Sequence, residues 1–457
     1  MASISSLGIG SGLDLNGLLN QLHDAERSKL EPIKQQIETQ QVKISAYGEL
    51  KGALSGFQSA NEALNDAALF QGLSTSVNGD AVQAAAGPEA SPGQYAIEVE
   101  QLATAGSLAT QRVESLDAEL NDADAMLELA FADDSLDHGV AIAADSTLED
   151  VRDAINADAE AAVTASIVND GEGYRLALMS QETGEQAAIV DANFATVATQ
   201  ATLEDEAVLQ EGQDARFEVN GIAVSSADNQ VDDAIQGVAL SLQGTGSSTL
   251  TVEPDTDSIR QAVADFVESY NELKDTAGKL TAFNGQDGEA GELIGDSAVR
   301  GIESRLRSDL ASVIEGSDHA MLADLGIALR VDGTLELDET KLEAALAQGP
   351  GEVGAFFAGE SATDGMSGRL DATLEQLLDS NGALEGAIGG AENRIDSLNE
   401  RYTRTEQSID TTIARYQTQF GQLDGMLAQM NQTSAYLTQQ LSHLPGQGQG
   451  EGGGGML

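Results

Sequence analysis

The sequence predicts an α+β multidomain protein in which two antiparallel β domains are inserted between helical N- and C-terminal segments. Apolar residues recur at helical spacing through both ends of the 457-residue chain. Short alternating runs separated by turn residues occupy the middle. The charge is concentrated there as well, because residues 71–390 hold 61 acidic and 13 basic side chains, a net of −48 out of −54. We therefore expect the near-neutral ends to make contacts and the acidic middle to face water.

The N-terminal segment carries an apolar stripe over residues 13–66, with steps that are typical of an amphipathic helix. Pro32 falls inside this stripe. Its ring removes one helical hydrogen bond, so we expect the helix to kink or restart there. The members of the stripe are Leu15, Leu18, Leu22, Leu30, Ile33, Ile37, Ile44, Tyr47, Leu54, Phe57 and Leu64.

The C-terminal segment carries a longer seam of about seven heptads, which no proline interrupts before Pro445. A single helix of this kind is marginal alone and needs a partner. The partner could be the N-terminal segment only, as an intramolecular hairpin, or that segment together with helices of other subunits. Periodicity does not separate these alternatives. The seam consists of Ile395, Leu398, Tyr402, Ile409, Ile413, Tyr416, Phe420, Leu423, Leu427, Met430, Leu437, Leu441 and Leu444.

The middle of the chain shows mostly β signals. Asn220-Gly221 between two alternating runs predicts a tight hairpin, and residues 163–167 and 174–178 predict a second hairpin with a longer loop. We expect residues 238–242 to pair with 250–252. A weak internal repeat relates residues 146–155 to 226–235 and predicts a small helix in each of two β units. Residues 114–211 hold 24 acidic and 2 basic side chains, which places that unit outermost.

Helical signals return after Pro254. An amphipathic face over residues 259–273 predicts a helix with Ser258 as its N-cap, and a second helix is expected near 297–314. Asp332-Gly333 predicts a further hairpin. The order helices, β insertion, helices gives a nested layout in which the first and last segments meet.

Composition excludes several classes of function. The chain has no cysteine, so disulfides and thiolate chemistry are excluded. The net charge of −54 disfavours nucleic acid and anionic membranes as partners, and no apolar run is long enough to span a bilayer. We expect no cleavable signal peptide. The four histidines are scattered, and no motif predicts a catalytic residue, a metal site or a cofactor. The low Lys content suggests a surface adapted to high salt.

Motifs at both ends carry a family resemblance. Internal ones lie at residues 44–51, 93–97, 293–297 and 325–338. Those at the two ends are Ser5-Ser6-Leu7-Gly8-Ile9-Gly10-Ser11-Gly12-Leu13-Asp14 and Thr433-Ser434-Ala435-Tyr436-Leu437-Thr438-Gln439-Gln440. Together, in this order, they resemble the flagellar filament-capping family, also called hook-associated protein 2. The similarity covers nearly the whole chain and is loosest over residues 114–211.

The resemblance implies a particular division into domains. The two ends would form a coiled-coil leg, followed by a helical domain and two β domains. The implied boundaries are 1–45 with 415–457 for the leg, 46–75 with 255–414 for the helical domain, 76–113 with 212–254 for the inner β domain and 114–211 for the outer acidic β domain.

The resemblance also implies a function. The protein would be a structural cap at the distal tip of the bacterial flagellar filament, where a ring of copies promotes flagellin folding and insertion and prevents loss of exported subunits. It would act without enzymatic chemistry or a cofactor, outside the cell, after export through the flagellar secretion channel. The implied partners are flagellin, hook–filament junction proteins, other copies of the chain and an export chaperone on the C-terminal helix. The alternative is a surface-exposed adhesin that binds through the acidic β domains.

Contacts with other subunits and partners are expected at the apolar residues of the two ends. These candidate interface residues are Leu7, Ile9, Leu13, Leu15, Leu18, Leu22, Tyr416, Phe420, Leu423, Leu427, Met430, Leu437 and Leu441.

Overall fold

The computed structural model describes residues 13–199, 205–283, 290–314, 319–359, 361 and 364–442, with the backbone alone for 205–209. Its contacts divide the chain into two compact units. The helical unit contains the described residues of Met1–Asn65, Ala264–Asp338 and Phe357–Leu457, and the β unit contains those of Asp66–Val263 and Glu339–Phe356. Terminal helices and antiparallel sheets confirm the predicted α+β class.

Both ends of the described chain are helical. Helix α1 (Leu15–Arg27) is followed by one 3-10 turn (Ser28–Leu30) and then by α2 (Glu31–Leu64), while α9 (Ala383–Ser442) forms the C-terminal end. Pro32 lies in the first turn of α2, where its missing N–H is not needed. The predicted restart of the helix at this proline is therefore confirmed.

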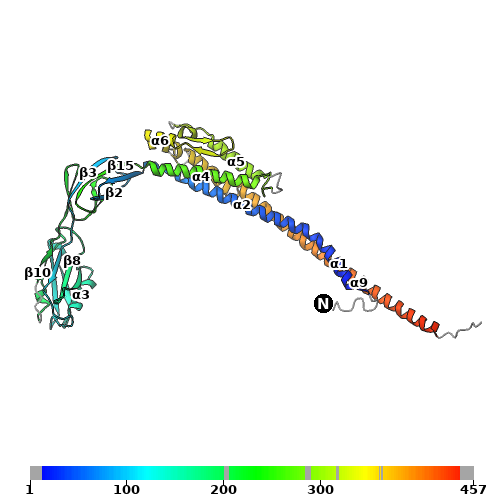
Figure 1. The fold of residues 1–457 in the computed structure, drawn as a ribbon, viewed down its shortest axis with the longest axis horizontal. Helices are drawn as coiled ribbons and strands as arrows, with labels where there is room; N and C mark the ends of the chain where they lie inside the picture. Colours follow the sequence, from blue (N-terminus) through cyan, green and yellow to red (C-terminus); the bar gives the residue numbers. More distant parts are fainter. Residues whose placement is uncertain are drawn as a thin grey trace, which may run out of the picture. The chain divides into compact units, whose positions relative to one another are not determined.

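Helix α2 runs antiparallel to α9 within the helical unit (Figure 1). The Lys34 ammonium lies 5.9 Å from the ring centroid of Tyr402. Further along α2, Lys51 Nζ lies 3.4 Å from Glu385 Oε2 on α9. Because the residue number rises in one helix as it falls in the other, the first and last parts of the chain form a long helical pair.

Further helices and a small hairpin complete the helical unit. The Phe57 ring on α2 lies 5.2 Å from that of Phe266 and 5.4 Å from that of Tyr270, which are both on the next helix of the core, α4. The buried Tyr47 hydroxyl donates to Asp296 Oδ2 over 2.6 Å. Burial and this hydrogen bond raise the pKa of Tyr47 above its ordinary value. The elements are the part of α4 (Thr256–Thr281) from Ala264 on, α5 (Ser297–Leu310), a 3-10 turn (Leu322–Leu325), β16 (Ile327–Leu329), β17 (Leu335–Leu337) and α8 (Met366–Leu378).

The start of α4 corrects one expectation. The helix begins at Thr256, two residues before Ser258. Asp255 accepts hydrogen bonds from the backbone N–H of Ser258 over 3.1 Å and from its hydroxyl over 2.6 Å. The cap is therefore the Asp255 carboxylate, which also acquires a lowered pKa from these bonds. Ser258 is its partner in the first turn rather than the N-cap.

The β unit contains two separate hydrophobic cores, which define an inner and an outer lobe. In the inner lobe, a five-stranded sheet of order β1-β15-β3-β11-β12 and a three-stranded sheet of order β13-β14-β2 share one core. The strands are β1 (Leu73–Asn78), β2 (Val82–Ala86), β3 (Gly93–Gln101), β11 (Ala215–Val219), β12 (Ile222–Ser226), β13 (Gln230–Ile235), β14 (Val238–Leu242) and β15 (Gly246–Pro254).

The tight hairpin predicted at Asn220-Gly221 is confirmed. Strands β11 and β12 pair up to Val219 and Ile222, so the loop has two residues. Asn220 and Gly221 both have positive φ, of 51° and 77°, as a type I′ turn requires.

Two expectations for the inner lobe are wrong. Strand β14 pairs with β13 and β2, whereas β15 pairs with β1 and β3, so residues 238–242 and 250–252 belong to different sheets. The Gly/Ser-rich connection crosses from one sheet to the other instead of closing a hairpin. Residues 231–235 form a strand rather than a small helix, because Val231 and Ile235 are buried in the core between the sheets.

The outer lobe combines two antiparallel sheets with one helix. The sheets have the orders β10-β4-β8-β7 and β6-β5-β9. The predicted helix after Ser146 is confirmed as α3, whose start carries a capping box between Thr147 and Asp150. The predicted pairing of residues 163–167 with 174–178 is also confirmed. The elements are β4 (Ser107–Thr110), β5 (Ala125–Phe131), β6 (His138–Ile142), α3 (Leu148–Ala157), β7 (Val163–Asn169), β8 (Tyr174–Ser180), β9 (Ile189–Ala192) and β10 (Asp205–Gln210).

Short helices account for the remaining regular structure. Helices α6 (Glu339–Gln348) and α7 (Pro350–Phe357) follow the β16–β17 hairpin, whose loop contains Gly333 at a φ of 89°. Short 3-10 turns lie at Leu69–Gln71, Asp134–Leu136 and Phe194–Thr196. Within the described residues, every helix is too short or too polar to cross a lipid bilayer.

Candidate oligomer and partner interface

The seam of α9 changes from buried to exposed along its length. Leu398 and Ile409, which lie in the part paired with α2 and its neighbours, are 4% and 3% exposed. Met430, Leu437 and Leu441 are 60%, 52% and 67% exposed. The register of α2 against α9 explains the change, since extending it places the start of α1 opposite roughly residue 421. Beyond that point α9 continues past α1 (Figure 1).

Leu7 and Ile9 lie outside the described residues, and the structure places the other predicted interface residues in three groups. Leu15 is buried in α1, which packs against α9. Leu22, Tyr416, Phe420 and Leu427 are partly buried. The exposed members are Leu13, Leu18, Leu423, Met430, Leu437 and Leu441.

Three further apolar residues of the two terminal segments were not among the predicted ones. Leu19 is buried one helical turn after Leu15, and the separation of four residues is the signal that could have found it. Met426 is 63% exposed and lies beside the predicted seam of α9, so heptad spacing alone gave no reason to choose it. Tyr436 is 60% exposed and lies about 100° around the helix from Leu437, away from the seam.

The exposed part of α9 is nearly free of charge. Between Tyr416 and Ser442 the sequence holds a single charged side chain, Asp424. A helix that faces only water is usually rich in Lys, Glu and Arg, whereas this one is rich in Gln, Thr, Leu and Met. Burying Leu437 or Leu441 would contribute roughly 1–2 kcal/mol each, because half or more of each side chain is now exposed. These residues, with Leu423, Met426 and Met430, form what we call the α9 stripe, which is suited to receive another helix.

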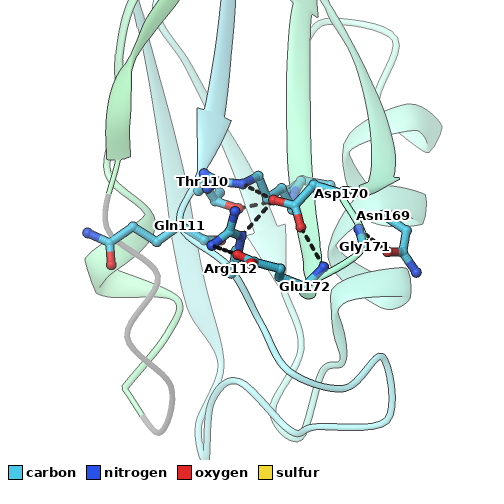
Figure 2. A network of polar contacts seen from close by, with 9 residues as sticks. Thr110, Gln111, Arg112, Asn169, Asp170, Gly171 and Glu172 are labelled. Atoms are coloured by element: carbon cyan, nitrogen blue, oxygen red, sulfur yellow. Dashed lines mark hydrogen bonds and ion pairs between the residues drawn. The ribbon is translucent and has the colours of Figure 1, made fainter.

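The surface of the outer lobe has the opposite character. Its few basic side chains are held by carboxylates, as Figure 2 shows for the loop between β7 and β8. Asp170 Oδ2 lies 2.6 Å from Arg112 Nε and 3.0 Å from Arg175 Nε. Arg112 also reaches Glu172 over 2.7 Å. Arg175 also donates to the carbonyl of Thr110, at the end of β4. The two guanidinium groups therefore connect the β7–β8 loop to the end of β4 and the residues that follow it.

This network stabilises the charged form of Asp170. The Arg112 guanidinium, then Arg175 and the backbone N–H of Glu172, hold the pKa of the Asp170 carboxyl well below its usual range. The same contact raises the pKa of Arg112. Arg112 and Arg175 therefore pair with carboxylates of the same lobe, and the more numerous acidic side chains of the lobe face solvent. In the described part of the chain, no group of three or more His, Asp or Glu is arranged to hold a metal ion.

Comparisons with known proteins agree with this arrangement. Residues 11–106 match the family described as flagellar hook-associated protein 2 N-terminus, and residues 212–432 match its C-terminus. Residues 131–182, in the outer lobe, match the flagellin hook IN motif.

Relatives and a solved structure extend the match to nearly the whole chain. Flagellar hook-associated protein 2 of Escherichia coli (strain K12) is 37% identical over 464 residues, which cover 97% of this chain and 99% of the relative. The protein of that name from Salmonella typhimurium is 33% identical over 468 residues, covering 97% and 99%. The crystal structure of the flagellar cap protein FliD D1-D2-D3 domains from Escherichia coli matches with a TM-score of 0.63 and 35% identity, covering 76% of this chain and 99% of that one. These findings confirm the resemblance seen in the sequence: the chain belongs to the flagellar hook-associated protein 2 family.

Proposed function

We propose that the protein is a structural cap at the distal tip of the bacterial flagellar filament. A ring of copies would hold arriving flagellin subunits, promote their folding and insertion, and prevent their loss. The action is binding and steric confinement, without a bond-making step. The observation that carries the proposal is the exposed, nearly uncharged α9 stripe, because an extended apolar helix face of this kind requires a partner.

The proposal assigns a role to each part of the chain. The leg (1–45 with 415–457) contacts neighbouring copies and the filament through the candidate interface residues. The helical domain (46–75 with 255–414) supports the leg. The two β domains (76–113 with 212–254, and 114–211) form a water-facing head whose acidic surface disfavours nonspecific contacts between heads.

The α9 stripe is also the reason to propose a binding partner before assembly. An exposed apolar helix is prone to nonspecific association inside the cell, so we propose that an export chaperone covers it until the chain passes through the flagellar secretion channel. At the growing filament the partners are flagellin, other copies and the hook–filament junction proteins. The comparisons lend no support to the alternative of an adhesin.

A charge introduced into the stripe tests the proposal. Leu437→Asp with Leu441→Asp should weaken chaperone binding and stop filament growth in cells that lack their own copy, since burying two carboxylates at a helix contact is costly. The matched control, Gln432→Asp with Gln439→Asp, adds the same charge to the opposite side of α9 and should leave growth unchanged. Far-UV circular dichroism should show the β signal of both variants intact. Normal filaments in the leucine variant would refute the role of the stripe.

A deletion separates the cap from the adhesin. Removing residues 1–45 should abolish filament growth while residues 75–255 stay folded, because the β unit has its own cores. If motility survived and only attachment to surfaces suffered, the capping function would be wrong.

A further inference from the structure

An open groove lies along α4 in the helical unit, on the side that faces the β16–β17 hairpin. Its volume is about 600 Å³, and its surface is mainly apolar, with Ala264, Val267 and Leu337 among its lining residues. Glu268 and Glu272 line it as well and are exposed. Neither carboxylate has an ion-pair partner among the described residues. The groove therefore offers an apolar floor beside unpaired negative charge.

Helix α5 of the same unit presents a surface of complementary character. Arg305 and Arg307 are exposed, and within the described chain neither has a carboxylate partner. The apolar residues at the two ends of this surface, Ile294 before the helix and Val313 after it, are 46% and 53% exposed. We call these residues the α5 surface: it is basic in the middle, at Arg305 and Arg307, and apolar at its two ends, at Ile294 and Val313.

We propose that the α5 surface of one copy docks in the α4 groove of a second copy of this chain. Arg305 and Arg307 would pair with Glu268 and Glu272, and the aliphatic stems of the arginines would cover the apolar floor. Ser304, a small exposed residue in the same helical turn as both arginines, lets the two helices approach closely.

The occupant is a second copy because the charged and apolar character of the two surfaces is complementary. The groove needs a basic surface with apolar ends, and this otherwise acidic chain provides that combination on α5 itself. Because the proposed function requires a ring, we take the contact to join α5 of one copy head-to-tail to α4 of the next. Head-to-tail contacts produce rings when the rotation closes. The inference rests on the self-association in the proposed function and adds to the leg a second, electrostatic contact in the helical unit.

Covalent trapping tests the contact directly. The chain has no cysteine, so the full-length protein with Ser304→Cys on α5 and Ala264→Cys in the groove has two thiols only. A short bismaleimide should join successive copies into a ladder of multimers on a denaturing gel. The matched control pairs Ser304→Cys with Ser55→Cys, an equally small, exposed residue on α2 of the same unit, and should give no ladder.

Charge reversal then tests the pairing. In the trapping variant, Arg305→Glu with Arg307→Glu should reduce the ladder by about tenfold or more, because like charges then face each other. Adding Glu268→Arg and Glu272→Arg to the same chain should restore it. The inference would be overturned if no ladder formed or if the Ser55→Cys control gave an equally strong ladder. It would also be overturned if the arginine reversal left the ladder unchanged, or if the added glutamate reversal did not restore it. Filament growth separates the two proposals. Normal growth without a ladder would refute only the contact between α5 and α4. Normal growth of the Leu437→Asp, Leu441→Asp variant would refute the proposed function.

Discussion

Phe57→Ala should strongly destabilise the helical unit. Phe57 is fully buried on α2, and its ring contacts Phe266 and Tyr270 on α4. Truncating a buried phenylalanine costs about 3–5 kcal/mol, and the loss of two aromatic contacts places this site toward the upper end, at about 4–5 kcal/mol. For a unit of this size, each kcal/mol lowers the melting midpoint by about 2–4 °C. The expected shift is therefore about 8–20 °C.

The assay is thermal unfolding followed by far-UV circular dichroism at the helical signal. Phe283→Ala is the matched control, because Phe283 is 76% exposed and its truncation should change stability by less than about 0.5 kcal/mol. Hydrogen exchange should show faster exchange in α2 and α4 of the Phe57 variant, with the β unit unchanged. If Phe57→Ala and Phe283→Ala melted at the same temperature, the aromatic cluster would not be the core that holds α2 and α4 together.

Three shorter predictions concern the β unit. Asp170→Asn should lower the melting midpoint most at pH 7 and by a smaller amount at pH 3. The folded-state pKa of Asp170 is held well below its usual range, so the stabilisation is complete above about pH 4 and declines as the pH falls toward the folded-state pKa; an equal loss at both pH values would contradict the role of the arginines. Gly221→Ala should cost about 1 kcal/mol in urea unfolding because its φ is 77°, whereas Gly244→Ala, which meets open space, should cost almost nothing. Unfolding of the outer lobe should shift to higher temperature between 0.05 M and 2 M NaCl, as salt screens the repulsion among the 24 acidic residues of 114–211; an unchanged midpoint would argue against a surface adapted to salt.

Local signals in the sequence predicted the parts of the fold that depend on neighbouring residues. The restart at Pro32 follows from the chemistry of one ring, and the Asn220-Gly221 turn follows from the positive φ angles that those residues tolerate. The pairing of residues 238–242 could not be predicted in the same way, because alternation identifies a strand without specifying its partner. The spacing of Val231 and Ile235 was ambiguous too, since residues four apart share a face in a helix and in a strand.

The sequence predicted which residues belong to the apolar seam, but not which of them are exposed. Heptad spacing selected Leu437 and Leu398 alike, although one is 52% and the other 4% exposed. The difference depends on where α1 begins opposite α9, which is a matter of three-dimensional register. The α5 surface gave no signal in the sequence for a related reason: Arg305 looks ordinary until the structure shows which arginines have found a carboxylate and which have not.

The pairing of α2 with α9 has a consequence for the order of events during synthesis. Lys51 and Glu385 are 334 positions apart, so a ribosome must deliver almost the entire polypeptide before the two can meet. The two lobes are formed by residues between α2 and α9, so they can fold while α1 and α2 are still without their partner helix. Closing so large a loop is slow, and a product that terminates early would leave α1 and α2 without α9, the helix against which both pack.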